Sequence, residues 1–249
     1  MLSIIIPTLN EEDYLPILLE SIKRQDFKDY EVIVADAGSK DKTLEIANSY
    51  KFKVVPGGLP ARGRNNGAKV ANGDVLFFLD ADTVLSDKFL DKSIKEFELR
   101  KLDIASFCLR PYPENRFEYF LINIFYNRMI VILEKILPHS AMGIIIKKEL
   151  FNKINGYDES IKLAEDHDLG RRAAKYAKFG INKFAKFGIS KFAKFGIIRS
   201  VEILISTRRF KKDSWFMTGT KFFLCQLHMI FIGPVRSNIF NYKFNHYKK

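Results

Sequence analysis

A run of five apolar residues, from Val75 to Leu79, is the feature that most constrains the fold. It lies between two acidic residues, and such a short aromatic and branched run is typical of a strand buried on both faces of a parallel sheet. Asp80 and Asp82 follow it directly. Carboxylates two positions apart lie on the same side of an extended chain, and their mutual repulsion favours a bound cation. Oxygen ligands suit Mg²⁺ or Mn²⁺ shared with substrate phosphates, although Asp-x-Asp pairs also occur in surface turns.

Strands and helices are expected to alternate around this run. Strands are predicted over residues 3–8, 31–36, 52–55 and 75–79, and helices over residues 15–22, 42–50 and 62–72. Further along, a helix is predicted over residues 86–100, and strands over residues 103–109, 142–146 and 198–206. Short links between alternating strands and helices predict an α/β fold, with a mostly parallel, Rossmann-like central sheet flanked by helices.

Charge divides the chain into two parts. Residues 175–249 hold 16 Lys and Arg against 2 acidic residues, whereas residues 1–174 hold 25 against 27. A basic segment this rich in Phe, Ile and Leu favours an anionic membrane surface as its partner, and not nucleic acid. We therefore expect a catalytic domain over residues 1–212 and a helical, basic, aromatic-rich, membrane-associating extension over residues 213–249.

Location can also be argued from the sequence. The chain enters a predicted strand at residue 2 without the features of a signal peptide, and its two cysteines lack metal-ligand spacing, which favours a reducing compartment. Between Lys221 and Arg236 lie 14 uncharged residues, about 21 Å of helix and too short to span a bilayer. These features predict a cytoplasmic protein, peripheral on the inner face of the membrane.

Four motifs occur in a fixed order: residues 4–11 (Ile-Ile-Ile-Pro-Thr-Leu-Asn-Glu), 36–39 (Asp-Ala-Gly-Ser), 64–68 (Arg-Asn-Asn-Gly-Ala) and 80–82 (Asp-Ala-Asp). Together they resemble the motifs of family 2 glycosyltransferases with the GT-A fold, and the resemblance covers roughly residues 2–210. It implies an enzyme that moves a sugar from a nucleotide diphosphate sugar, with a UDP-sugar favoured, to an acceptor with inversion at the anomeric carbon.

The resemblance implies a role for residues near the nucleoside. Asp36 would accept a hydrogen bond from the base N–H of uracil or thymine, and Pro7, Thr8 and Glu11 would meet the nucleoside from the loop after the first strand. Without the resemblance, an aspartate at this position would cap the next turn equally well.

It also implies roles for residues near the diphosphate and the cation. Arg64 would bind diphosphate oxygens through its forked guanidinium, with Arg62 as the alternative. Asp82 would be the direct ligand of Mg²⁺ or Mn²⁺. Asp80 would bind either the ribose or a metal-bound water.

A second motif begins at Glu165. The run Glu165-Asp166-His167-Asp168-Leu169, followed by Arg172, resembles the Glu-Asp-x-Asp-Leu-x-x-Arg motif of the family. The resemblance assigns Asp166 as the general base and Arg172 to substrate binding. An acceptor hydroxyl must lose its proton during attack, whereas a phosphate acceptor needs no base, so this motif favours a hydroxyl acceptor on a glycan or glycolipid.

Three further stretches left more than one interpretation open. Arg208 and Arg209 either contact the departing diphosphate, as the resemblance implies, or are juxtamembrane basic residues. Residues 178–197 repeat with a period of eight; they are either a local duplication tolerated on the surface or, given their cationic, Phe-rich composition, a segment that binds anionic lipid. The mostly apolar residues 117–137 are predicted to form a helix that is buried in the core, lies in the acceptor cleft or dips into lipid.

The sequence therefore predicts a metal-dependent, inverting glycosyltransferase. Transfer to a polyprenyl phosphate and nucleotidyl transfer on a similar sheet are the alternatives among enzymes. A non-catalytic membrane-binding protein that retains the fold is the alternative from another class.

Overall fold

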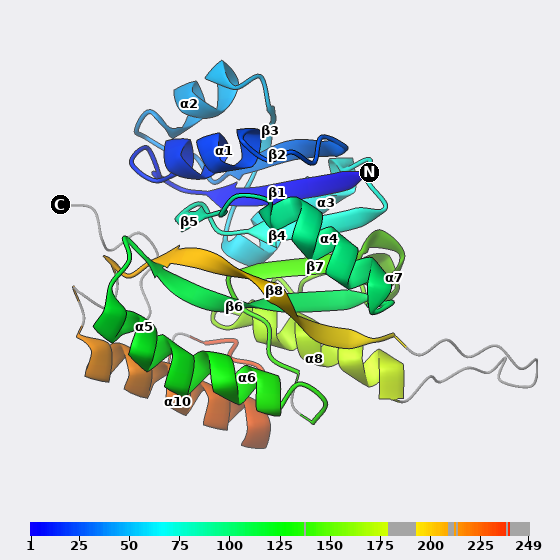
Figure 1. Cartoon of the computed structure of the whole chain (residues 1–249), viewed down its shortest axis with the longest axis vertical. Coiled ribbons are helices and arrows are strands. Elements are labelled where there is room, and N and C mark those ends of the chain that lie inside the picture. Colours follow the sequence, from blue (N-terminus) through cyan, green and yellow to red (C-terminus); the bar gives the residue numbers. More distant parts are fainter. Residues whose placement is uncertain (137, 179–192, 209–211, 213, 238, 240–249) are drawn as a thin grey trace, which may run out of the picture.

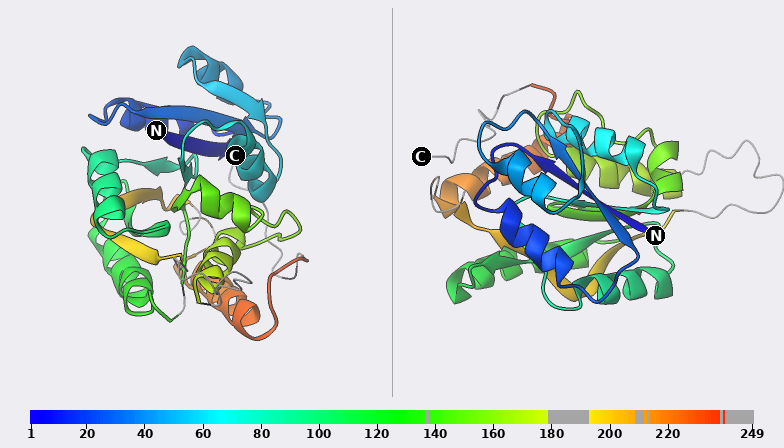
Figure 2. Two further views of the ribbon diagram at one scale, coloured as in Figure 1. Left: turned by 90° about the vertical axis from the view of Figure 1, so that its right-hand side faces the viewer. Right: turned by 90° about the horizontal axis from the view of Figure 1, so that it is seen from above.

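A computed structural model describes residues 1–136, 138–178, 193–208, 212, 214–237 and 239 (Figures 1 and 2). Its strands form one sheet in the order β3-β2-β1-β4-β7-β6-β8-β5. Their bounds are Leu2–Thr8 (β1), Tyr30–Asp36 (β2), Lys53–Pro56 (β3), Val75–Leu79 (β4), Thr83–Val84 (β5), Ile104–Tyr112 (β6), Gly143–Lys147 (β7) and Phe195–Ser206 (β8). The predicted strands are all present, and none of their bounds differs by more than three residues.

The sheet is mostly parallel, as expected. Strands β1 to β4 pair in parallel, and β6 pairs in parallel with β8. Strand β7 runs antiparallel to both β4 and β6, and β5 runs antiparallel to β8. The direction of β7 was not predicted, because the periodicity of a buried strand is the same in either direction.

Helices cover both faces of the sheet (Figure 1). Buried residues of α1, α2 and α4 pack on one face, and those of α3, α7 and α8 pack on the other. The helical segments are Leu15–Lys23 (α1), Thr43–Ser49 (α2), Pro60–Val70 (α3), Phe89–Leu99 (α4), Arg116–Ile122 (α5), Asn123–Asn127 (the π-helical turn η1), Arg128–Ile132 (α6), Lys148–Lys153 (α7), Glu165–Lys178 (α8) and Trp215–Phe231 (α10). The predicted α/β architecture is confirmed.

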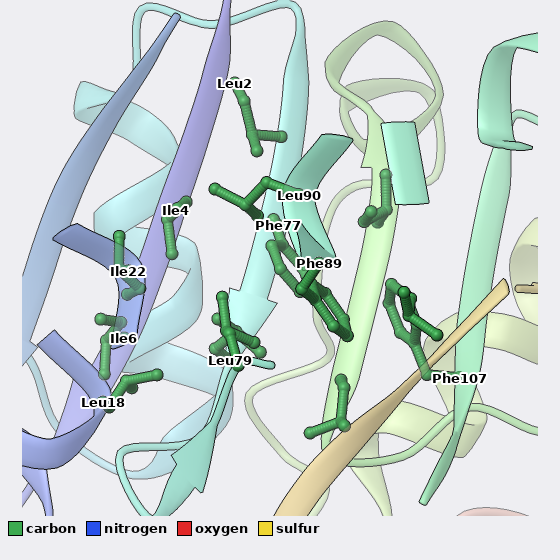
Figure 3. Packing of buried hydrophobic residues seen from close by; sticks show 14 of the residues in the cluster. Leu2, Ile4, Ile6, Leu18, Ile22, Phe77, Leu79, Phe89, Leu90 and Phe107 are labelled. Carbon is green, nitrogen blue, oxygen red and sulfur yellow. The ribbon is translucent and has the colours of Figure 1, made fainter. Parts of the chain in front are cut away.

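Strand β4 carries the centre of the core (Figure 3). Its side chains alternate between the two faces, so that Phe77 stacks on Phe89 with ring centroids 6.0 Å apart, while Phe78 lies 5.3 Å from the ring of Phe151. Burying each of these rings contributes roughly 1.5–3 kcal/mol. This packing fixes the carboxyl end of β4, from which Asp80 and Asp82 follow.

The segment of residues 117–137 lies with its polar side inward. The buried Asn127 amide donates to the carbonyl of Leu109 (2.9 Å) and accepts from its N–H (2.8 Å). Glu134 is also buried and pairs with Arg100 at 2.6 Å. Large apolar side chains point outward instead: Phe117, Phe120, Ile124, Phe125, Ile132 and Ile136 are exposed. The interpretation as a fully buried helix is therefore wrong, because buried polar partners fix the opposite orientation.

The C-terminal extension begins as a helix, as predicted, and packs on the preceding chain. Cys225, Met229 and Val235 form a small buried cluster with Leu163. Arg236, just after it, pairs with Asp158 at 3.0 Å. Of the repeat at residues 178–197, residues 179–192 lie outside the described part of the structure, as does Arg209. Within the described residues, no helix has the length and apolar character needed to cross a membrane.

Candidate active site

Apart from Arg172, the described residues of the predicted site lie at or beside one edge of the sheet. Strands β1 and β2 pair with Thr8 opposite Asp36, and β1 pairs with β4 with Ile5 opposite Phe78. The carboxyl ends of three parallel strands therefore meet, at the edge where open α/β sheets bind ligands. Segments that follow them in sequence, including the starts of α3 and α8, complete the site.

Asp36 is buried and already holds its neighbours. One carboxylate oxygen accepts from the N–H groups of Gly38 (2.9 Å) and Ser39 (2.8 Å). The other accepts from the hydroxyls of Thr8 (3.0 Å) and Ser39 (2.5 Å). Asp36 therefore shapes the turn after β2 in this structure, and the N–H of a base would have to replace one of these hydroxyl donors.

Arg208 joins two strand ends. Its guanidinium donates to both carboxylate oxygens of Glu11 (2.7 and 3.0 Å) and lies 3.2 Å from Asp82. The ring of Tyr14 lies 4.5 Å from the guanidinium carbon. Burial raises the pKa of Glu11 above its ordinary value, although the Arg208 hydrogen bond lowers it in part. This arginine thus lies between the loop after β1 and the predicted metal ligand.

Arg64 is the centre of a second cluster. Its side chain is 4% exposed, and it donates to Asp80 (2.6 Å) and Glu165 (2.6 Å) while lying 3.6 Å from Asp166. Its Nε has no hydrogen-bond partner among the described residues. A buried arginine in contact with three carboxylates holds them together in spite of their repulsion. In this structure Arg64 positions acidic residues. To contact a diphosphate as predicted, it would have to share its N–H donors between the diphosphate and these carboxylates.

Helix α3 brings Arg64 to this position through a close approach to β1. A Cβ atom at Gly67 would lie only 2.4 Å from Cγ2 of Ile5, and one at Gly63 would lie 3.3 Å from Pro7. The glycines therefore allow the helix to approach the strand closely, so that Arg64, one turn before Gly67, lies over the end of β4.

Asp166 lies at the start of α8, facing Arg64 and Tyr157. Its side chain is 14% exposed, and the Tyr157 hydroxyl donates to it at 3.1 Å. Burial raises the pKa of Asp166, the charge of Arg64 lowers it, and the charges of Glu165 and Asp80 raise it, giving a value of about 7. A carboxyl group with a pKa near neutrality exchanges a proton readily, as a general base must.

Two buried histidines pack against each other near the start of α8. The rings of His139 and His167 lie 3.8 Å apart and are buried, with Tyr126 against His139 at 5.4 Å. Burial lowers the pKa of His139 to about 4 and that of His167 well below its ordinary value. Nδ1 of His167 and the hydroxyl of Tyr126 have no hydrogen-bond partner within the described chain. Both histidines are therefore neutral at pH 7.

Arg172 lies outside these clusters. It donates to Asp168 (2.6 Å) and to the carbonyls of Ile154 (2.6 Å) and Gly156 (2.7 Å). The sequence predicted substrate binding, whereas the structure directs its guanidinium to the turn between α7 and α8. Arg62, the alternative to Arg64, is exposed beside Gly58.

Three contributors to the site were not predicted. Glu165 and Tyr157 touch Arg64 or Asp166, and the histidine pair lies near the start of α8. The Asn-Gly-Tyr-Asp turn at residues 155–158 was the available signal for Tyr157, but the sequence gives no indication that its hydroxyl turns toward α8.

The acidic residues fit a divalent cation shared with a ligand. Carboxylates outnumber guanidinium groups here, so an anionic diphosphate would need a cation beside it. Asp80 and Asp82 keep about 30% and 28% of their side chains exposed. Among the described residues, no three His, Cys, Asp or Glu side chains form a group that could hold a metal. Mg²⁺ is commonly bound by one or two protein carboxylates, with substrate phosphates as further ligands.

Comparisons with known proteins identify the family that this chain resembles. The family model described as "Glycosyl transferase family 2" matches residues 3–155. An uncharacterized glycosyltransferase of Haemophilus influenzae is 32% identical over 182 residues, which cover 68% of this chain and 60% of that protein. The uncharacterized glycosyltransferase EpsJ of Bacillus subtilis is 28% identical over 197 residues, covering 72% and 57%. The chain thus spans about 60% of the length of these relatives.

Solved structures show the same fold. S. aureus TarS 1-349 in complex with UDP-GlcNAc has a TM-score of 0.61 at 22% identity, covering 83% of this chain and 58% of that one. The mannosyltransferase PcManGT of Pyrobaculum calidifontis, in complex with GDP-Man and Mn²⁺, has a TM-score of 0.63 at 16% identity, covering 88% and 61%.

Proposed function

Because this chain belongs to glycosyl transferase family 2, we propose that it transfers a sugar from a nucleotide diphosphate sugar to a hydroxyl group of a glycan or glycolipid, with inversion and with Mg²⁺ or Mn²⁺. The observation that carries the proposal is Asp166, a buried carboxylate with a pKa of about 7, joined through Arg64 to Asp80 at the end of β4. Such a base beside a predicted diphosphate site suits an acceptor hydroxyl.

The donor would lie across the ends of β1, β2 and β4. Its nucleoside would contact Pro7, Thr8, Glu11 and Asp36, with a hydroxyl of Thr8 or Ser39 turning away from Asp36. The complexes of TarS with UDP-GlcNAc and of PcManGT with GDP-Man support a nucleotide sugar as donor. Because the N–H of uracil can donate to Asp36, and because TarS binds UDP-GlcNAc, we favour a uridine nucleotide.

Asp82 and Asp80 would hold the cation, as the Mn²⁺ in the PcManGT complex supports. When bound, the cation would neutralise charge on the leaving diphosphate. Arg208 would contribute positive charge from the protein, and the same role is proposed for Arg209, which lies outside the described residues. Arg208 would leave Asp82 when the donor binds, and its pairing with Glu11 keeps it nearby.

Asp166 would act on the acceptor. The acceptor oxygen attacks the anomeric carbon on the face opposite the diphosphate, the bond from that carbon to the diphosphate oxygen breaks, and the acceptor proton moves to Asp166. A positioned base contributes typically about 10²–10⁴-fold in rate. Tyr157 and Arg64 orient the carboxylate, and Arg172 acts indirectly by holding the turn that carries Tyr157.

We further propose that the acceptor is carried at the cytoplasmic face of a membrane. The support is the basic, aromatic-rich segment after residue 212. One relative is named poly(ribitol-phosphate) beta-N-acetylglucosaminyltransferase, and another is named PGL/p-HBAD biosynthesis glycosyltransferase. These relatives match only about a third of this chain.

A panel of nucleotide sugars with Mn²⁺ tests the proposed reaction. We expect one donor to release a nucleoside diphosphate, faster when an acceptor with free hydroxyls is present. Release of pyrophosphate would indicate nucleotidyl transfer instead. A product in which the sugar is joined to the acceptor through a labile sugar–phosphate bond would indicate a phosphate acceptor. Failure to bind any nucleotide sugar by calorimetry would leave the chain without a donor and contradict the proposal.

A further inference from the structure

The segments α5–η1–α6 and α10 expose large apolar side chains at one end of the molecule, which we call the apolar end (residues 116–136 and 215–232). Figure 1 and the left view of Figure 2 both place these helices at the end of the long axis opposite α2. Of the sixteen large apolar side chains exposed among the described residues, twelve belong to these two segments. Such concentration marks an interaction surface.

We infer that the apolar end docks on the surface of an anionic lipid bilayer. The inference deepens the proposed function, and it rests on that function for the membrane-borne acceptor, whereas docking itself can be measured without turnover. It assigns much of the contact to α5–α6, in the middle of the chain, and not to the basic tail alone.

The outward orientation of these side chains is set by buried polar contacts. Asn127 exchanges two hydrogen bonds with the backbone of Leu109, and Glu134 accepts from Arg100 and from the backbone N–H of Ile197 (2.9 Å). Turning the helix to bury its apolar side would break these contacts and leave polar groups unpaired. The sequence therefore specifies an exposed apolar face, with Phe125 72% and Ile132 75% exposed.

The charges around this face select an anionic partner. Within residues 115–136, the two acidic residues, Glu118 and Glu134, are both buried, whereas Arg116, Arg128 and Lys135 are exposed. From residue 214 to residue 249 the sequence contains no acidic residue at all. Anionic headgroups attract such a rim, whereas a second copy of the chain would bring the same positive charges against it.

The length of the helices fits docking in the plane of the membrane. Helix α10 has 17 residues and is shorter than a spanning helix, and it exposes Phe223 and Phe231. Helices that bury one apolar face at the headgroup boundary, with basic residues beside it, bind in this way. Both segments would enter together because they lie at the same end of the molecule.

Vesicle flotation of the full chain tests the inference, with phosphatidylcholine vesicles with and without phosphatidylglycerol. We expect wild type to float with the anionic vesicles and the double variant Phe120→Ser/Phe125→Ser to lose at least tenfold in partitioning. Leu99→Ser is the matched control, because Leu99 is 73% exposed on α4, outside the apolar end. Arg128→Gln should weaken binding several-fold, whereas Lys95→Gln on α4 should not.

Donor hydrolysis in vesicle-free buffer separates this inference from the proposed function. All variants should keep wild-type hydrolysis, which also shows that they are folded. Flotation without any hydrolysis would sustain docking and remove the proposed enzyme. Equal flotation of wild type and the double variant would overturn the docking surface. The inference would also be overturned if wild type failed to float and formed a dimer in sedimentation velocity, while the double variant was a monomer.

Discussion

Asp166 must be ionised to accept a proton, and its environment opposes ionisation. Burial and the neighbouring carboxylates give it a pKa of about 7. We expect kcat/KM to fall about tenfold per pH unit below pH 7, because the protonated form cannot act as base. A pH profile of kcat/KM measures this, and an acid limb near pH 4 would contradict the assignment.

Tyr157 provides the control for that profile. Its hydroxyl donates to Asp166 and lowers the pKa of that carboxyl. In Tyr157→Phe the midpoint of the acid limb should therefore move to higher pH. A limb that stays in place would show that another group titrates.

In the proposed site, Arg208 would compete with the cation for Asp82. Its guanidinium lies 3.2 Å from that carboxylate, and removing a positive charge at such a distance is worth about 1 kcal/mol, or roughly fivefold in affinity. We expect Arg208→Ala to bind Mn²⁺ more tightly without nucleotide, yet to turn over more slowly. Calorimetry with Mn²⁺ alone measures the first effect, with the exposed Arg24→Ala as control. Weaker binding would show that Arg208 does not oppose the cation.

Single residues show where prediction from sequence stopped. The resemblance identified Asp166 and Arg64, and the structure brings them within 3.6 Å. It could not show that Arg64 also pairs with Glu165, because that contact joins positions 101 residues apart. Arg172 was assigned to substrate for the same reason, since its partners at residues 154 and 156 are visible only after folding.

Helix α3 sets the position of Arg64, and Gly67 sets the position of the helix. In Gly67→Ala the new Cβ would lie 2.4 Å from Ile5, so the helix must shift from β1. We expect a loss of about 1–3 kcal/mol in unfolding free energy, together with lower activity. Urea unfolding and donor hydrolysis measure these effects.

Gly219→Ala is the matched control for that substitution. It lies within α10 and nothing is found within 4 Å of its added Cβ. An alanine there should be neutral or stabilising, because glycine is the poorer helix former. Equal effects at both glycines would refute close packing of α3 as the cause.

At the level of whole elements, local pattern predicted most of the fold. The sequence predicted the bounds of β1, β2, β4 and α1 closely. Each of these elements is defined by the apolar pattern of its own few residues. The sequence left three placements open for the segment of residues 117–137, because periodicity defines two faces without saying which one faces inward. Only the contacts of Asn127 and Glu134 decide that.

The unfolding free energy of the whole molecule should depend on the ionisation of Asp166. Its folded pKa of about 7 lies above the ordinary 3.8, so the folded state holds the proton more tightly and stability falls as pH rises through that window. Asp166→Asn removes this loss. Between pH 5 and pH 8 we expect the unfolding free energy of this variant to rise relative to that of wild type by at most about 3 kcal/mol, which corresponds to about two pH units below the folded pKa.

Urea unfolding at the two pH values, without metal or nucleotide, measures this difference. The exposed Asp87→Asn serves as control. If the difference in unfolding free energy between Asp166→Asn and wild type were the same at pH 8 as at pH 5, ionisation of the buried carboxylate would not destabilise the folded state.

Over the whole molecule, the acidic site and the apolar end differ in charge and in place. The site lies at the carboxyl ends of β1, β2 and β4, whereas the apolar end lies at α5–α6 and α10. Helix α8 links them, because Asp166 lies at its start and Arg171 donates to Gln226 of α10 at 3.1 Å. An enzyme that takes its acceptor from a membrane needs such a link.

The most direct test measures donor binding and acceptor-dependent turnover together in Asp166→Asn. Loss of the base should reduce turnover by about 10²–10⁴-fold, while the dissociation constant of the nucleotide sugar with Mn²⁺ changes little. Wild-type turnover in this variant would contradict the assignment of Asp166 as the group that takes the acceptor proton.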